Sequence, residues 1–122
     1  MPSSSSATRV RSRIRLELYL PERSERLRYQ VAREWLIREL TYSQGGTSRV
    51  ESLSGTYLSR EGKVIADQVS LVWCDTILNW NSRRERAELL AYAAQLKRFL
   101  EMHLVEEEAI LIAVVPVYHL VT

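Results

Sequence analysis

Residues 13–20 read RIRLELYL, a run in which every second side chain is aliphatic. Successive side chains of a β-strand point to opposite faces, so this alternation predicts a strand with one buried side and one open side. Pro21 follows directly and ends the predicted strand, because proline has no N–H to donate to a neighbouring strand. The predicted buried side consists of Ile14, Leu16, Leu18 and Leu20, and the open side of Arg13, Arg15, Glu17 and Tyr19.

The spacing of apolar residues after Pro21 changes from two to three or four, which is typical of a helix. We predict this helix from about Glu22 to Leu40, with Glu22 and Glu25 in a first turn where they interact favourably with the helix dipole. The stretch SQGG (residues 43–46) follows as a flexible exit. The predicted core side of the helix contains Leu27, Val31 and Trp35, together with Ile37 or Leu40.

Residues 47–74 have the pattern of a β-hairpin. Two strands, residues 47–58 and 63–74, flank the short polar connection SREG (residues 59–62), which ends on a glycine suited to a left-handed turn position. Gly55 marks either a β-bulge or a close backbone approach. In the second strand we expect one set of side chains in the core (Ile65, Val69, Leu71 and Trp73) and the alternate set on the open side (Gln68, Ser70, Val72 and Cys74).

A second helix and a last strand complete the chain. Ser82 and Glu85 have the spacing of a capping box at the start of a helix. The stretch EEE (residues 106–108) is a solvated connector, and residues 109–121 are almost wholly apolar and rich in β-branched residues, which predicts a strand. The apolar stripe of the helix comprises Leu89, Tyr92, Leu96, Phe99 and Leu100.

The order of these elements predicts an α+β, ferredoxin-like fold of the β-α-β-β-α-β type. In that fold, two helices cover one face of a four-stranded antiparallel sheet with the spatial order 4-1-3-2. The length of 122 residues suits one domain. We place this domain at residues 13–122 and expect the Ser- and Arg-rich residues 1–12 to be a disordered tail.

The composition is that of a globular protein, with 46% hydrophobic and 26% charged residues. No run reaches the roughly 20 apolar residues of a membrane span. The N-terminus also lacks the apolar stretch of a secretory signal, so we expect a cytoplasmic protein with no membrane partner. Cys74 is the single cysteine, which excludes an intrachain disulfide; we interpret it as a buried, inert thiol.

The net charge of +2 is unevenly distributed, with a local charge of +4 over residues 1–40. This basic region makes nucleic-acid binding a hypothesis for the function, the third after the two given below. It is disfavoured because no arginine cluster is interleaved with the aromatic residues of a base-stacking platform. The arginines that would carry it are Arg9, Arg11, Arg13 and Arg15.

The last strand has apolar side chains on both of its sides. Whether Leu111, Ala113, Val115 and Val117 or the alternate set Ile110, Ile112 and Val114 faces the helices, the other set lies on the open face of the sheet. An apolar patch of that kind indicates an interaction, and we predict a homo-oligomer, a dimer, with open faces or edge strands packed together. The predicted interface residues are Tyr19, Trp73, Val115, Val117 and Tyr118.

The hairpin motifs GTY (residues 55–57) and GKVIAD (residues 62–67) resemble those of small bacterial ferredoxin-like proteins of unassigned function. The resemblance extends from about Arg13 to Val121, and the architecture is similar to that of dimeric α/β-barrel proteins. The latter include small monooxygenases, isomerases and decarboxylases. The resemblance implies the ferredoxin-like fold, and it makes a small cofactor-free enzyme, isomerase or monooxygenase-like, the alternative function.

Candidate chemical groups are few and have no motif spacing. The weak catalytic candidates are His119, Asp67, Tyr57 and Arg15. Asp75 is either a functional carboxylate or, the reading we favour, a turn residue that bonds backbone N–H groups. The two histidines, His103 and His119, have no metal-ligand spacing, so we expect neither a metal nor a cofactor. The leading hypothesis is therefore an oligomeric binding protein that recognises a protein or a small ligand, acting through the open sheet face or an intersubunit cleft.

Overall fold

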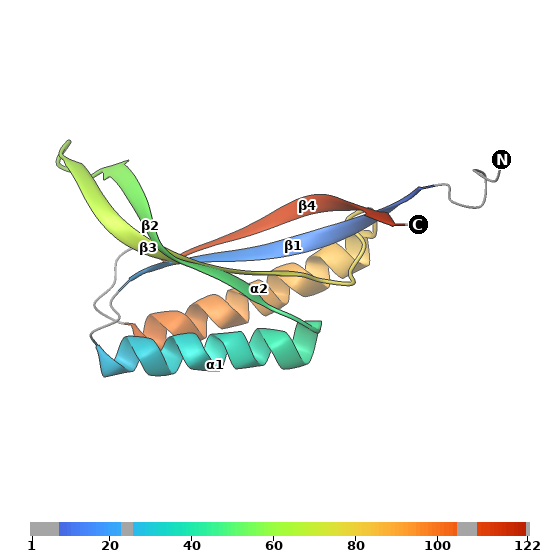
Figure 1. Cartoon of the computed structure of the whole chain (residues 1–122), viewed down its shortest axis with the longest axis horizontal. Helices are drawn as coiled ribbons and strands as arrows, with labels where there is room; N and C mark the ends of the chain where they lie inside the picture. The colour runs from blue at the N-terminus through green and yellow to red at the C-terminus, as the bar shows by residue number, and fades with distance from the viewer. Residues whose placement is uncertain (1–7, 23–25, 105–109, 122) are drawn as a thin grey trace.

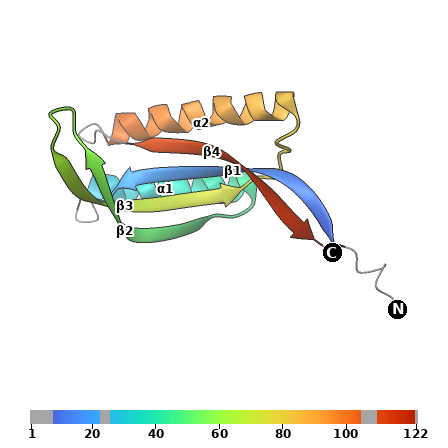
Figure 2. The same ribbon diagram turned by 90° about the horizontal axis from the view of Figure 1, so that it is seen from above.

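The computed structural model of the chain describes residues 8–22, 26–104 and 110–121. Its strands form an antiparallel sheet in the order β2-β3-β1-β4, and both helices lie on one side of it (Figures 1 and 2). This arrangement confirms the predicted ferredoxin-like fold. The elements are β1 (Arg9–Pro21), α1 (Leu27–Gln44), β2 (Ser48–Leu58), β3 (Val64–Asp75), α2 (Arg83–His103) and β4 (Leu111–Val121).

Strand β1 is central and has the predicted alternation. Its four aliphatic residues from Ile14 to Leu20 are fully buried between the sheet and the helices. The strand starts at Arg9 rather than at Arg13, because Arg9 to Ser12 pair with Val121 to Tyr118 of β4. The boundary of the predicted tail therefore moves to before Arg9, and residues 1–7 lie outside the described part of the chain.

The core side of α1 agrees with the prediction only in part: Leu40 is buried and Trp35 packs against the core, as predicted. Leu27 and Val31 are 74% and 57% exposed, while Tyr29 and Leu36 are buried. Two sets of apolar residues in this helix have helical spacing, and the set that contains Tyr29 and Ala32 packs on the sheet. The small side chain of Ala32 allows the helix to approach the sheet closely. The Tyr29 hydroxyl donates a buried hydrogen bond to Ser70 Oγ at 2.8 Å. The helix also begins at Leu27, so Glu22 is not in its first turn, and Glu25 lies outside the described residues.

The two faces of β3 are the reverse of the prediction. Val72 and Cys74 are buried beneath the helices, as is Ser70, whereas Leu71 and Trp73 lie on the other face. The register with β1 explains the reversal: Leu16 pairs with Cys74 and Leu18 with Val72, and directly paired residues of antiparallel strands share a face. Both sides of β3 carry apolar residues, so the alternation could not distinguish them.

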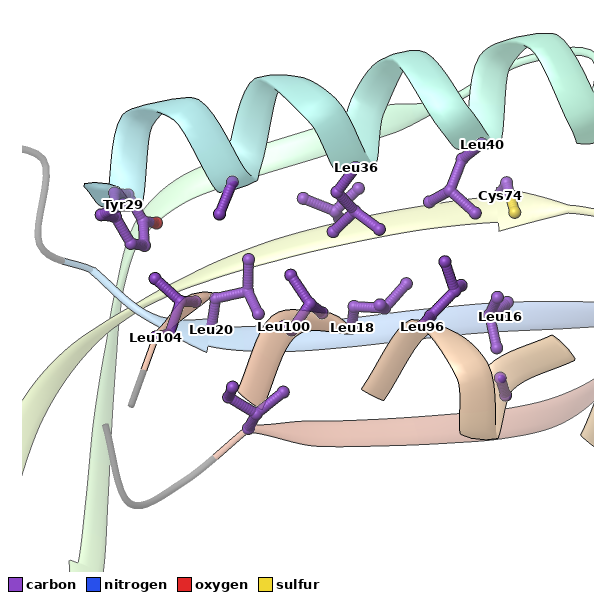
Figure 3. Packing of buried hydrophobic residues seen from close by; sticks show 14 residues of the cluster. Leu16, Leu18, Leu20, Tyr29, Leu36, Leu40, Cys74, Leu96, Leu100 and Leu104 are labelled. Carbon is purple, nitrogen blue, oxygen red and sulfur yellow. The ribbon is translucent and has the colours of Figure 1, made fainter. Parts of the chain in front are cut away.

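Helix α2 and β4 close the core shown in Figure 3. The backbone N–H of Glu85 donates to Ser82 Oγ at 3.2 Å, which confirms the predicted cap, although the Glu85 carboxylate accepts from the N–H of Asn79 instead. In β4, Ile112 and Val114 pack against the core, which places the set from Leu111 to Val117 on the open face. The buried residues of α2 are Leu89, Ala93, Leu96 and Leu100.

Two turns follow the sequence, and one irregularity does not. Gly45 has φ +93° and donates its N–H to Thr41 O at 3.0 Å, which ends α1, and Gly62 has φ +81° in the β2–β3 turn. The bulge in β2 lies between Val50 and Leu53, where Ser52 has φ +59°, and not at Gly55. The β2–β3 and β1–β4 ribbons project beyond the helices at opposite ends of the sheet (Figure 1).

Candidate functional site

The open face, which we define as the side of the sheet that neither helix covers, carries apolar side chains on β2, β3 and β4, whereas the side chains of β1 on this face are charged except for Tyr19. Leu111 is 60% exposed there, and Trp73, Val115 and Val117 are half-buried. By register, Tyr19 lies opposite both Leu71 and Leu111, so apolar side chains run across three strands. Val50 and Leu53, 39% and 37% exposed, extend this surface onto β2.

One polar cluster on this face joins the three strands β1, β3 and β4; we call it the Asp75 cluster and define it as Arg15, Asp75 and His119. Arg15 Nε and Nη2 donate to Asp75 Oδ1 and Oδ2 at 2.6 and 3.0 Å. His119 Nε2 lies 3.0 Å from Asp75 Oδ2. The three side chains are 33%, 26% and 38% exposed, so they are accessible without being fully solvated.

The position of His119 depends on the coiling of the β1–β4 ribbon. In the strand register Arg15 is opposite both Asp75 and Val115, whereas His119 is opposite Arg11, further along the ribbon. The two strands coil around each other toward the chain ends (Figure 2), and this coiling brings the imidazole to the carboxylate.

Charge in the cluster is nearly compensated. The Arg15 guanidinium, hydrogen bonded to both carboxylate oxygens, lowers the pKa of Asp75 against the opposing effect of burial, and His119 contributes in the same direction. The same hydrogen bond raises the pKa of Arg15. Asp75 is therefore ionised at neutral pH and Arg15 is charged.

A second polar contact lies further along the same face of β1. Tyr19 donates its hydroxyl to Glu17 Oε1 at 2.9 Å, and this bond raises the pKa of the phenol. The open face of β1 thus runs from the basic residues Arg11 and Arg13, through the compensated Arg15, to the acidic Glu17.

A groove borders the open face where β3 ends. We call it the α1–β2 groove: it has a volume of about 380 Å³ and is lined by residues 44–48 and by Trp73, Cys74 and Asp75. Asp75 therefore belongs both to the cluster and to the wall of the groove. The sequence suggested only a flexible exit at residues 43–46, because nothing local shows that this segment lies beside the end of β3.

The structure separates the other candidate residues from the cluster. Asp67 pairs by register with Gly55 in the β2–β3 ribbon, where its Oδ1 accepts the N–H of Gln68 at 2.9 Å. Tyr57 pairs with Ile65 in the same ribbon. Tyr118, 63% exposed, pairs with Ser12 and points to the side opposite His119.

Asp75 has a different part from the one that the sequence favoured. The turn after β3 is held by Thr76, whose Oγ1 accepts the N–H of Leu78 at 3.2 Å and donates to Ile14 O at 2.9 Å. Asp75 is left for Arg15 and His119. The signal available in the sequence was its position at a strand end, and its partners, 60 and 44 residues away, could not be read from it.

The thiol of Cys74 lies beside the Asp75 cluster, but it is not a reactive group. Cys74 is buried, and burial raises its pKa to about 11, so the thiol is not a nucleophile at neutral pH. In the described part of the chain, no three His, Cys, Asp or Glu side chains come together in a way that could hold a metal ion.

Comparison with known proteins identifies the fold alone. No model of a known protein family matches the chain, and no curated protein matches it. Solved structures do: the divalent cation tolerance protein Cut A1 from Thermus thermophilus is 16% identical with a TM-score of 0.52, covering 87% of this chain and 84% of its own. The PII-like protein CPII from Thiomonas intermedia is 17% identical with a TM-score of 0.53, covering 95% and 100%.

A phage SAM lyase, solved in complex with S-methyl-5′-thioadenosine, has a TM-score of 0.56 at 12% identity, with coverage of 90% of this chain and 89% of its own. The chain thus has the PII- and CutA-like form of the ferredoxin-like fold. No helix in residues 8–22, 26–104 and 110–121 is long and apolar enough to span a membrane.

Proposed function

We propose that this chain is the subunit of a homodimeric binding protein in which the open faces of two sheets pack together. The observation that carries the proposal is the apolar surface that spans all four strands and that neither helix covers. Such a surface is costly to leave in water, and packing it against a partner removes that cost.

A second copy of the same chain fits this surface by charge as well as by polarity. Along β1 the open face is basic at Arg11 and Arg13 and acidic at Glu17. Two copies related by a two-fold axis, with their β1 strands antiparallel, would set the basic end of each face against the acidic end of the other. The Asp75 cluster, with its charges nearly compensated, is compatible with the middle of such a contact.

Charging the centre of the face tests the assembly. Val115→Glu should give a folded monomer, because the new carboxylate would lose its water in the dimer while Arg15, the residue opposite it, is already bonded to both oxygens of Asp75. Leu90→Glu on α2, at a position 56% exposed, introduces the same charge on the helix side and should leave the dimer intact. Mass by light scattering, with circular dichroism as a check of folding, reads both variants, and a Val115→Glu dimer would reject the proposed face.

The binding role that we propose for the dimer is capture of a small ligand in the α1–β2 groove. The groove borders the open face, so a second subunit packed on that face would extend its wall into an intersubunit cleft. S-methyl-5′-thioadenosine, the ligand in the phage SAM lyase structure, is a suitable first probe.

Binding of the probe should raise the melting temperature, since a ligand that binds only the folded state stabilises it. Ser48→Trp enlarges a side chain that lines the groove and should abolish the shift. Thr56→Trp, further along β2 and away from the groove, is the matched control and should retain it. A wild-type chain that shows no shift would reject this nucleoside as the ligand.

A further inference from the structure

We propose that Asp75 and His119 form a proton-transfer pair for a small substrate with an apolar body, with His119 accepting the proton and Asp75 as its positioning residue. The pair is assembled from two strands that are not neighbours, and it opens onto the apolar face of the sheet. The inference applies to the subunit with its open face free: in the proposed dimer the second copy would cover the cluster, so the pair would act only when the subunits are apart.

The hydrogen bond between the two residues determines where the imidazole proton lies. Asp75 is ionised, and both of its oxygens accept hydrogen bonds from Arg15. An ionised carboxylate has no hydrogen to donate, so Asp75 can only accept hydrogen bonds. The bond to His119 Nε2 at 3.0 Å therefore requires hydrogen on Nε2, and in the neutral ring the proton-accepting lone pair is then on Nδ1. A carboxylate that fixes the tautomer in this way also stabilises the imidazolium formed when Nδ1 takes up a proton.

The imidazole is not needed to compensate charge, because Arg15 and Asp75 already form a two-bond ion pair. The same ion pair argues against a metal ion. Both carboxylate oxygens are engaged by donors, and the guanidinium places a fixed positive charge beside them. Proton transfer remains as the chemistry that uses the free nitrogen of His119.

The surroundings define the substrate. Val115 and Val117 lie on the same face as His119, at the two preceding outward positions of β4, and Trp73 precedes Asp75 on the same face of β3. In residues 8–22, 26–104 and 110–121, no other carboxylate takes part in the hydrogen bonds of the cluster. Arg11 is opposite His119 in the strand register and Arg13 is opposite Val117, so the charged groups that flank the imidazole on β1 are basic. A substrate with an apolar body would pack against the valines and present its reacting proton, or a water molecule, to His119.

Hydrolysis of 4-nitrophenyl acetate tests the pair with a defined probe. His119 Nδ1 takes a proton from a water molecule as the water oxygen bonds to the ester carbonyl carbon. The tetrahedral intermediate then collapses, and the electron pair leaves on 4-nitrophenolate. Acetic acid forms and ionises to acetate, and its proton and the proton on Nδ1 both pass to solvent. The rate should exceed that of free imidazole at equal concentration.

The variants separate a reactive imidazole from a structural one. His119→Gln should lower the rate of hydrolysis by about tenfold or more, to the rate measured in buffer without protein. His103→Gln is the matched control and should leave the rate unchanged. His103 Nδ1 is hydrogen bonded to the backbone carbonyl of Phe99 at 2.9 Å, and the imidazole stacks on the ring of Phe99. Equal rates for wild type and His119→Gln would overturn the proposal.

Asp75→Asn tests positioning, and it should lower kcat while leaving KM nearly unchanged, because Asp75 acts through His119. Arg15→Lys keeps the positive charge but loses the pair of hydrogen bonds to Asp75, and it should give a rate between those of the wild type and Asp75→Asn. If Asp75→Asn does not fold, the two histidine variants still decide the result. The mass of each variant, measured in the same preparation, keeps a failure of the pair apart from a failure of the proposed dimer.

Discussion

Asp75 ends β3 and forms hydrogen bonds with side chains from two other strands, Arg15 of β1 and His119 of β4. Its pKa is lowered in the folded state, chiefly by Arg15. A carboxyl group with a lowered pKa stabilises the fold above its unfolded value, near 4, and this contribution is lost as the pH falls through the folded value.

Asp75→Asn should therefore lower the free energy of unfolding by about 1 kcal/mol at pH 7, a modest value because the pair is partly solvated. Below about pH 4 the difference from the wild type should shrink, since the unfolded wild-type chain takes up a proton at Asp75 before the folded chain does. Urea denaturation at a series of pH values measures both. A difference that does not change with pH would mean that Asp75 contributes by packing rather than by charge.

Substitution of Tyr92 tests the contact between α1 and α2 in the same way, through the pH dependence of stability. The Tyr92 hydroxyl donates to Glu39 Oε2 at 2.6 Å and bonds Ser43 Oγ at 2.9 Å, and burial raises its pKa to about 12. Tyr92→Phe should cost about 1–2 kcal/mol at pH 7.

The raised pKa gives this tyrosine its own pH dependence. Its contribution is present below the unfolded value, near 10, and declines as the pH rises toward 12, because the unfolded state ionises first. The stability of wild type and Tyr92→Phe should therefore converge above pH 10 in denaturation experiments. Curves that stay parallel would show that the phenol is not buried between the helices in solution.

Cys74 provides a probe of the core. The buried thiol, with its pKa raised to about 11, should react with a disulfide reagent at pH 8 only as fast as the chain opens, and completely in denaturant. Absorbance of the released thiolate measures this. Fast reaction of the native chain would contradict the assigned face of β3.

At the scale of elements, the sequence was informative where one side of an element was polar. The alternation of β1 correctly predicted the buried side, since only one register leaves Arg15 and Glu17 in solvent. The capping serine of α2 and the turn glycines Gly45 and Gly62 were also predictable, because each is required by local backbone chemistry.

Elements with two apolar sides could not be assigned in this way. Both faces of β3 and two stripes of α1 are apolar, and the choice between them depends on pairing with β1 and on the Tyr29–Ser70 bond, which are tertiary contacts. The candidate site had the same limit. Arg15 and His119 were among the predicted residues, but Arg15 meets Asp75 through the register of β1 with β3, and His119 reaches it through the coiling of β1 and β4.

The cap of α2 allows an element-scale prediction. Ser82→Ala removes the acceptor for the N–H of Glu85 and should lower the free energy of unfolding by about 1 kcal/mol. Ser82→Gly should cost only a few tenths, since glycine is also accepted at this position. Thermal or urea denaturation of the two variants compares them; equal losses would indicate that the serine acts through contacts other than the cap.

At the scale of the whole molecule, the shape is that of a sheet with one covered and one open face. Both ribbons, β1–β4 and β2–β3, extend past the helices (Figure 1), and the apolar surface of the open face continues across all four strands. A subunit of this form buries only one side of its sheet by itself. Assembly through the other side is the simplest way to protect the remaining apolar surface.

The mass of the unmodified chain in native mass spectrometry reports whether the open faces pair. The subunit mass is 14.2 kDa, and pairing of two open faces predicts a species of twice that mass that persists on dilution to low micromolar concentration. A monomer under the same conditions would contradict the assignment of the open face as the site of self-assembly. A larger assembly would keep the face but reject the two-fold arrangement.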